Sequence, residues 1–257
     1  MVADFRRTPA DIYAEWAGCT KCELGVRRNA IGAPMVIGEG PRRAIMLIGE
    51  GPGRHEEEEG RPFVGKSGEL LRQILQAYNL EQYCYITNIV VCRSCEVRLD
   101  DTGQPRIRKR RGQPDEIVYS DVVPTPKQIA TCSPRLFDEI YSVDPVVIVT
   151  LGNAAASFLL GRPVAIMKER GNPEHCEIPG ATWVPQLTDK KKAWARKVKG
   201  VEILPVEPNK LRYLVIPTLH PAFVLRKEGD HGKDSPWNQL ASDIKLAGEV
   251  YQKCMLE

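Results

Sequence analysis

The sequence predicts an α/β protein, a three-layer α/β/α sandwich around a central, mostly parallel four-stranded sheet. Four short apolar segments contain little polar alternation, which is typical of strands buried on both faces. Segments with helical apolar spacing separate them, and strands that alternate with helices form parallel sheets with helices on both sides. The predicted strands span residues 44–48, 85–91, 145–152 and 213–218.

Helices are predicted from their start signals and their apolar faces. Thr8 and Pro9 supply an N-cap residue and a proline at the first helical position, so a helix begins there and ends near Gly18. Thr125 begins another helix with a capping box, because Gln128 stands three residues later. The spacing of apolar residues predicts further helices over about 66–78, 153–160 and 235–251.

Three segments show no sustained periodicity. Residues 27–43 are rich in glycine and proline, which favours irregular or hairpin structure. The polar segment that follows the second strand indicates a long loop or a small excursion, and the segment before the last strand is equally irregular. We expect one domain over residues 1–257, with insertions at about 93–124 and 162–210.

The loop after the first strand is the most unusual stretch of the chain. Gly49 ends the strand, and Gly51 and Gly53 on either side of a proline argue against a helix following at once. Four glutamates, 56–59, then crowd what we expect to be a short loop, and Phe63 should lie exposed among glycines. Ligands of α/β proteins bind at such strand ends. A glycine-rich surface turn with a solvated acidic patch explains the same residues.

Composition narrows the class of protein. The 257-residue chain is 42% hydrophobic and 27% charged, which is ordinary for a globular protein. The sequence shows neither a long apolar run nor a signal peptide, so we expect a cytoplasmic monomer without membrane contact. Eight cysteines in such a chain indicate metal or cluster binding more than disulfides. A net charge of +3 is too small to establish a nucleic-acid partner.

Several short motifs stand at or near the predicted strand ends. They are Gly49-Glu50-Gly51-Pro52-Gly53, Gly60-Arg61-Pro62-Phe63-Val64-Gly65, Thr87-Asn88-Ile89, Cys92-Arg93 and His220-Pro221-Ala222. Their order along the chain resembles that in the family-four uracil-DNA glycosylases, the iron–sulfur branch of that superfamily. Ile89 replaces a valine of the family pattern, and the similarity covers about residues 8–160 and 211–253.

The resemblance implies a monofunctional uracil-DNA glycosylase. Such an enzyme hydrolyses the N-glycosidic bond of flipped-out deoxyuridine in single- or double-stranded DNA, and leaves free uracil and an abasic site. Phe63 would stack on the uracil ring, and Asn88 would pair with uracil O4 and N3–H, an order of acceptor and donor that cytosine reverses. Glu56 would fill the space of the thymine methyl group, with Gly49 and Gly51 beside the base.

The resemblance also implies how the bond would be cleaved. His220 would donate a hydrogen bond to uracil O2, where negative charge builds as the bond breaks. Glu50 would position the attacking water or the sugar cation. Another family of the superfamily has an aspartate base and a tyrosine where this chain has Gly51 and Gly53, so those two roles are not carried over.

Spacing alone and the resemblance lead to different metal sites. Cys19-x-x-Cys22 and Cys92-x-x-Cys95 together form a pattern typical of a four-cysteine zinc site. The resemblance instead implies a [4Fe–4S] cluster bound by Cys19, Cys22, Cys92 and Cys132.

Two basic stretches, 106–111 and 190–199, are additions to the family pattern. Solvated surface is the usual explanation of a charge run. An enzyme that grips DNA needs phosphate contacts, however, so we expect at least one stretch to bind DNA. The candidate DNA-binding residues are Arg108, Arg110, Lys190, Lys191, Lys192 and Arg196.

Three other functions are compatible with the sequence. The chain could be a non-catalytic iron–sulfur protein of the same fold that binds DNA. It could remove another deaminated base. It could also hydrolyse a free nucleotide with a metal held by the acidic loop.

Overall fold

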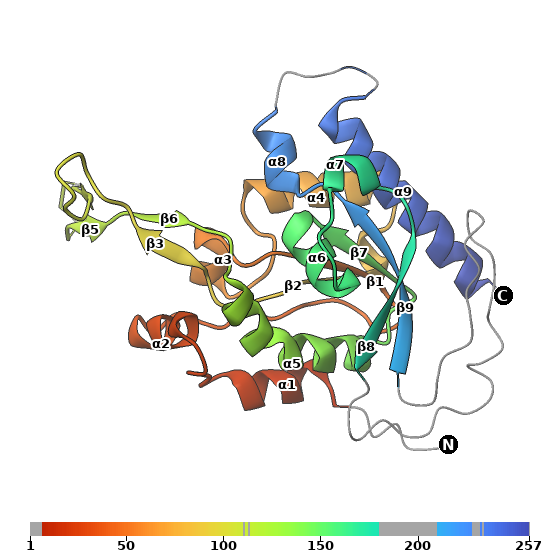
Figure 1. The fold of residues 1–257 in the computed structure, drawn as a ribbon, viewed down its shortest axis with the longest axis horizontal. Helices are drawn as coiled ribbons and strands as arrows, with labels where there is room; N and C mark the ends of the chain where they lie inside the picture. The colour runs from red at the N-terminus through yellow and green to blue at the C-terminus, as the bar shows by residue number, and fades with distance from the viewer. Residues whose placement is uncertain are drawn as a thin grey trace.

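A computed structural model describes residues 7–256 except 110, 113, 180–209, 228–231 and 233. Within these residues the central sheet has five strands in the order β2-β1-β7-β9-β8 (Figure 1). Its first four strands run parallel. They are β1 (Ile45–Gly49), β2 (Cys84–Asn88), β7 (Val147–Leu151) and β9 (Lys210–Thr218), so the four predicted strands are confirmed.

The fifth strand, β8 (Glu174–Pro179), was not predicted and pairs antiparallel with β9 at the edge of the sheet. Cys176 and Ile178 are buried, whereas Glu177 between them is exposed. An edge strand covered on one face alternates in this way. The short polar segment therefore lacks the continuous apolar run that marks the central strands.

Helices cover both faces of the sheet (Figure 1). On one face, Ile45 and Leu47 share a hydrophobic core with α4 (Lys66–Ala77) and α9 (Pro236–Met255). On the other, Met46 and Ile48 share a second core with α5 (Pro126–Val143) and α6 (Asn153–Leu160). Successive side chains of a strand point to opposite faces, so one apolar strand serves both cores. The predicted three-layer arrangement is confirmed. The 3₁₀ helix η1 (Glu81–Tyr83) leads into β2.

Two helices occupy segments predicted to be irregular. α1 (Pro9–Trp16) has its predicted cap at Thr8, but α2 (Glu23–Ala30) extends into the predicted irregular segment. α3 (Arg54–Glu59) contains the four glutamates that we expected in a loop. Gly53 caps this helix, and Glu56 accepts its N–H from the third helical position. Glycine before a short acidic segment thus starts a helix here instead of preventing one.

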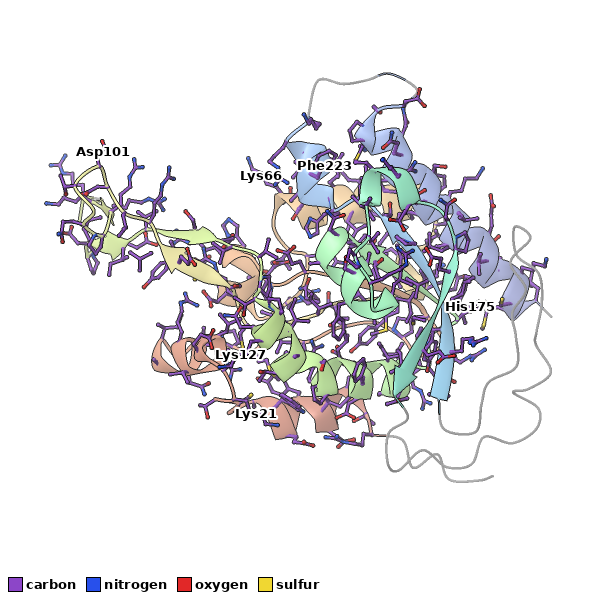
Figure 2. The ribbon with its side chains drawn as sticks, viewed as in Figure 1. Lys21, Lys66, Asp101, Lys127, His175 and Phe223 are labelled. Carbon is purple, nitrogen blue, oxygen red and sulfur yellow. The ribbon has the colours of Figure 1, made fainter. Side chains whose placement is uncertain are left out.

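Residues 95–121 form an arm that projects away from the sheet (Figure 1). At its root, β3 (Cys95–Val97) pairs antiparallel with β6 (Tyr119–Asp121). Farther out, β4 (Ile107–Arg108) pairs with β5 (Glu116–Ile117), and Asp101 lies near the far end (Figure 2). The segment predicted as a long loop or small excursion is therefore a narrow β-ribbon.

Two short helices complete the described part of the chain. α7 (Ile166–Glu169) precedes β8, and α8 (Pro221–Leu225) follows β9. None of the described helices is both long and apolar enough to cross a membrane.

Candidate active site and cysteine cavity

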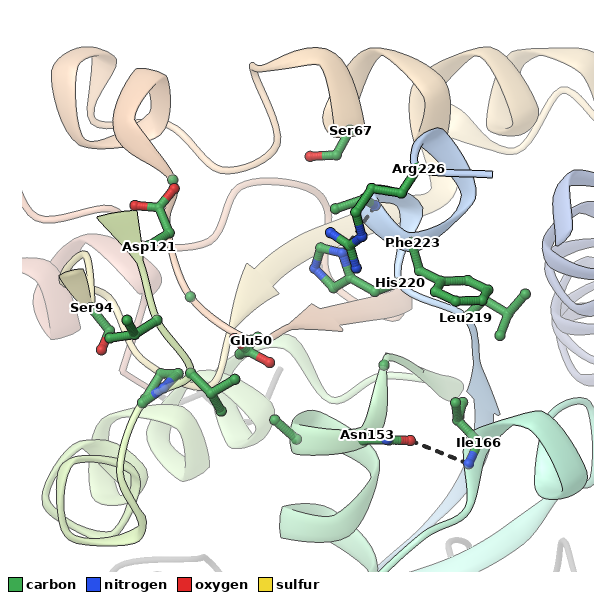
Figure 3. Close-up of a pocket in the computed structure, with 18 of the residues that line it drawn as sticks. Glu50, Ser67, Ser94, Asp121, Asn153, Ile166, Leu219, His220, Phe223 and Arg226 are labelled. Atoms are coloured by element: carbon green, nitrogen blue, oxygen red, sulfur yellow. Dashed lines mark hydrogen bonds between the residues drawn. The ribbon is translucent and has the colours of Figure 1, made fainter. Parts of the chain in front are cut away.

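A cavity of about 810 Å³ lies at the carboxyl ends of the parallel strands (Figure 3). The segments that follow β1, β7 and β9 line it, together with Ser94 and Asp121 at the root of the arm. Ligands of parallel α/β sheets bind at this edge. Most of the predicted site residues converge here: Glu50, Gly51, Glu56, Phe63 and His220.

Asn88 ends β2, directly opposite Gly49 in the neighbouring strand. A side chain on Gly49 would collide with Asn88 Oδ1 and would lie 2.7 Å from the Phe63 ring. Glycine at 49 therefore brings the Asn88 amide and the Phe63 ring close together. Asn88 Oδ1 and Nδ2 are both buried without a hydrogen-bond partner among the described residues. An unpaired buried amide costs free energy, which marks this point as a place for a ligand with a matching donor and acceptor.

Phe63 is only 2% exposed, contrary to the exposed position that the sequence indicated. Its backbone has a φ of 54°, in the left-handed region that is rare for bulky residues. Gly68 permits this conformation, because a Cβ at that position would collide with the Phe63 carbonyl oxygen. The Phe63 ring lies 6.1 Å from the His220 ring between centroids, with 31° between their planes. Strained backbone of this kind is typical of ligand-binding sites.

Glu56 fixes the loop that carries Phe63. Its two carboxylate oxygens accept the backbone N–H groups of Gly53 and Phe63. Burial raises its pKa above the ordinary value, against the opposing effect of those two hydrogen bonds. This side chain is therefore buried and hydrogen-bonded, not part of a solvated acidic patch.

His220 lies between β9 and α8 and caps that helix, since its Nδ1 accepts the Ala222 N–H at 3.1 Å. Burial, with a smaller effect of the Arg226 charge, lowers the pKa of His220 to about 4. The imidazole is therefore neutral near pH 7. Because Nδ1 accepts a hydrogen bond, the single ring proton resides on Nε2. His220 can thus donate one hydrogen bond from Nε2.

Glu50 follows β1 and lines the same cavity (Figure 3). Burial raises the pKa of its carboxyl above the ordinary value. Raised pKa values at clefts are characteristic of acids and bases that act on a substrate. Glu50 and His220 reach the cavity from different strand ends, β1 and β9, as the sequence predicted.

A second, smaller cavity is lined by the four cysteines that the resemblance implied. Its other lining residues include Trp16, Leu24 and Met35, so the surroundings are apolar. Burial raises the pKa of the Cys92 thiol to about 12, and the other three cysteines add to that rise because they are near. The four thiols are Cys19, Cys22, Cys92 and Cys132.

Cys95 does not line this cavity. It begins β3 at the root of the arm, where burial raises the pKa of its thiol. The charges of Arg27 and Arg93 oppose this rise, whereas those of Glu57 and Asp121 add to it. Within the described residues no three His, Cys, Asp or Glu side chains are grouped to hold a single metal ion. Cys95 thus lies apart from the cavity that Cys19, Cys22 and Cys92 line, which gives the four-cysteine zinc pattern no support.

The acidic helix α3 gives no support to the alternative of a metal held by its glutamates. Glu57 forms an ion pair with Arg27, with 2.6 Å between Oε1 and Nη1. Glu58 pairs with Arg54 at 2.7 Å. These carboxylates are occupied by cations of the protein itself.

The predicted DNA-binding residues are mostly untested by the structure. Lys190, Lys191, Lys192, Arg196 and Arg110 lie outside the described residues. Arg108 lies in β4 on the arm, and its Nη1 is 3.8 Å from Glu116 Oε2.

Some cavity residues were not singled out from the sequence. Ser67, Asn153 and Arg226 line the cavity. Asn153 follows β7 just as Glu50 follows β1, so its place after a predicted strand was the available signal. Ser67 and Arg226 follow no strand directly, and only the fold brings them here.

Comparison with known proteins agrees with this geometry. The sequence profile of the Uracil DNA glycosylase superfamily matches residues 37–241, so the chain belongs to that superfamily. The Type-4 uracil-DNA glycosylase of Thermotoga maritima is 32% identical over 215 residues, which are 82% of this chain and 80% of that protein. Within the superfamily the chain therefore groups with the type-4 enzymes, which confirms the resemblance.

Two further relatives carry the same name. The Type-4 uracil-DNA glycosylase of Sulfurisphaera tokodaii is 31% identical over 83% of this chain and 74% of its own length. The one of Archaeoglobus fulgidus is 29% identical over 95% of this chain and 93% of its own length. The similarity thus extends over most of this chain and most of each relative.

Proposed function

We propose that this protein removes uracil from DNA by hydrolysing the N-glycosidic bond of flipped-out deoxyuridine, leaving free uracil and an abasic site. The observation that carries the proposal is the Asn88 amide, buried and unpaired among the described residues, beside Gly49 and Phe63. Uracil presents an acceptor at O4 and a donor at N3–H, which one amide group can satisfy together. Cytosine presents the reverse order and would pair with Asn88 only after its amide turned over.

Phe63 and His220 complete this proposed base site. The Phe63 ring supplies a flat apolar surface for the base, and Glu56 holds its loop through the Phe63 N–H. The neutral His220 donates from Nε2 to uracil O2 as the C1′–N1 bond breaks and the base becomes an anion. A donor aimed at developing charge contributes about 3 kcal/mol in comparable sites.

One experiment tests the function. The protein is incubated with uracil-containing oligonucleotides, single- and double-stranded, without added metal, and then treated with alkali. Strand scission at the former uracil is expected, since alkali breaks the chain at an abasic site. Absence of product from every uracil substrate, with DNA binding retained, would favour the non-catalytic DNA-binding protein instead. Hypoxanthine-containing oligonucleotides in the same assay test for another deaminated base.

Glu50 is proposed to act as a carboxylate that positions water or stabilises the sugar cation. Its pKa is raised by burial, so the single-turnover rate should fall as the pH decreases through a value above the ordinary pKa of a glutamate. The pKa of His220 is about 4 and lies below this fall. We expect Glu50→Gln to lower the plateau rate and to abolish the acid limb. An acid limb that persists unchanged in Glu50→Gln would assign it to another group.

We also propose that Cys19, Cys22, Cys92 and Cys132 hold a [4Fe–4S] cluster. The support is the donor set: four thiols around one apolar cavity, from three separate parts of the chain. Each thiolate of such a cluster binds a different iron, so its cysteines lie farther apart than the ligands of one metal ion. When bound, the cluster supplies iron–thiolate bonds that tie the segment after α1 and the segment after β2 to α5.

Cysteine variants test this ligand set. Cys132→Ala is expected to lose iron and the broad visible absorbance of a thiolate-bound cluster, and to lower the thermal midpoint. Cys95→Ala is the matched control and should keep all three properties, because Cys95 lies outside the cavity. Stoichiometric zinc in a colourless protein that Cys132→Ala does not alter would overturn the assignment.

DNA contact by the basic stretches is the remaining part of the proposal. A triple variant, Lys190→Ala, Lys191→Ala and Lys192→Ala, should weaken binding alike for all sequences. It should also reduce the slope of log affinity against log salt, since fewer counterions are released. Arg108→Ala and Arg108→Lys test the arm in the same titration. A salt slope equal to that of the unaltered protein would show that a given stretch is solvated surface.

A further inference from the structure

Arg135 is a fully buried cation in contact with both Asn88 and Cys132. It belongs to α5, one turn after Cys132, and is 0% exposed. Its Nη2 donates to the carbonyl oxygens of Asn88 at 2.8 Å and Ile89 at 2.9 Å. The same nitrogen lies 3.9 Å from Cys132 Sγ. One guanidinium therefore contacts the backbone of the proposed base-reading residue and the sulfur of a proposed cluster ligand.

Glu139 balances this charge inside the protein. It is 1% exposed and accepts a hydrogen bond from Arg135 Nη1. It also accepts the Gly38 N–H at 2.9 Å, the Tyr85 hydroxyl at 3.2 Å and the Thr87 hydroxyl at 2.9 Å. A buried ion pair with this many hydrogen bonds has a defined geometry, because moving either partner would leave polar groups unpaired.

The position of the Arg135 guanidinium is suited to transmit a displacement of Cys132 to the backbone of Asn88. Asn88 is the last residue of β2, so its carbonyl marks the point where the chain leaves the sheet. The next residues lead to Cys92, which lines the cysteine cavity with Cys132. A shift of Cys132 therefore acts on Arg135 directly, and a shift of Arg135 acts on the backbone of Asn88.

We propose that Arg135 is a positioning residue that couples the Cys132 side of the cluster site to the base-reading amide of Asn88. On the proposed function of uracil removal, an intact cluster then strengthens uracil binding, although none of its ligands contacts the base. The coupled group is the Asn88 side chain, so the effect concerns the base and not the DNA backbone.

Arg135→Lys tests this coupling. Lysine keeps the positive charge, but a single ammonium group cannot replace the planar guanidinium, which pairs with Glu139 through Nη1 and reaches two carbonyl oxygens through Nη2. We expect inhibition by free uracil to weaken about tenfold or more, the loss expected for one charge-assisted hydrogen bond. Affinity for DNA with an abasic site should stay unchanged, and the visible circular dichroism of the cluster should shift.

Two comparisons separate coupling from general damage. Arg170→Lys alters another ion pair, a part-buried one in which Arg170 Nε lies 2.9 Å from Asp243 Oδ2, and it should leave the visible spectrum unchanged. In a double-mutant cycle, Cys132→Ser and Arg135→Lys should each weaken uracil inhibition, while the two together weaken it by less than the product of both effects.

Each result has a defined meaning. Uracil inhibition that is unchanged in Arg135→Lys, or that falls only in parallel with abasic-DNA affinity, would overturn the coupling. Independent effects in the double-mutant cycle would also overturn it. If the unaltered protein binds no uracil or shows no visible bands, the proposed function or the proposed cluster fails instead, which distinguishes the two failures.

Discussion

Asn88→Ala is expected to lower kcat/KM for uracil excision by about 10²- to 10³-fold, equivalent to the loss of two buried hydrogen bonds. The amide is the group we propose to read O4 and N3–H of the base, and alanine offers neither a donor nor an acceptor. The fold should persist. Asn88 pairs with β1 through its backbone, and its side-chain amide makes no hydrogen bond within the described structure. Steady-state kinetics measure the loss of kcat/KM, and a thermal melt checks that the fold persists.

Thr150→Val is the matched control for this change. Thr150 lies in β7, on the other side of β1 from Asn88, and is 0% exposed. Its hydroxyl is likewise unpaired in the described part of the chain. Because Thr150 is not among the residues proposed to contact the base, the valine variant should excise uracil at the normal rate. Normal kcat/KM in Asn88→Ala would contradict the role of the amide in base reading.

The sequence predicted best where local signals decide the structure. The four parallel strands are buried on both faces and appear as apolar runs, and the predicted N-cap at Thr8 and capping box at Thr125 are both formed. The convergence of Glu50 and His220 was predictable for a topological reason. Parallel strands end at one edge of a sheet, so residues that follow different strands meet there.

The sequence predicted poorly where a contact between distant residues decides the structure. Phe63 is buried because Gly68 allows close approach of its carbonyl and Glu56 binds its N–H. Neither contact has a periodic signature. Arg135 gave no signal either, because a lone arginine in a helix is most often exposed, and only the fold places it against Asn88.

His220 presents a separate test, because it has one observed role and one proposed role. It caps α8 through Nδ1, and we propose that it donates Nε2–H to uracil O2. The two roles can be separated by substitution. Asparagine is a good N-cap residue but is too short to take the place of Nε2, whereas alanine supplies neither group.

We expect His220→Ala and His220→Asn to lower the single-turnover rate of bond cleavage by the same factor, about 10²- to 10³-fold, as for other donors to a developing anion. Binding of uracil-containing DNA should change little, because this hydrogen bond strengthens only as charge moves onto the base. Only His220→Ala should also lose stability, by about 1 kcal/mol for a helix cap. Recovery of the rate in His220→Asn would mean that the histidine acts only as a cap. A loss confined to DNA affinity would place it in binding instead of bond cleavage.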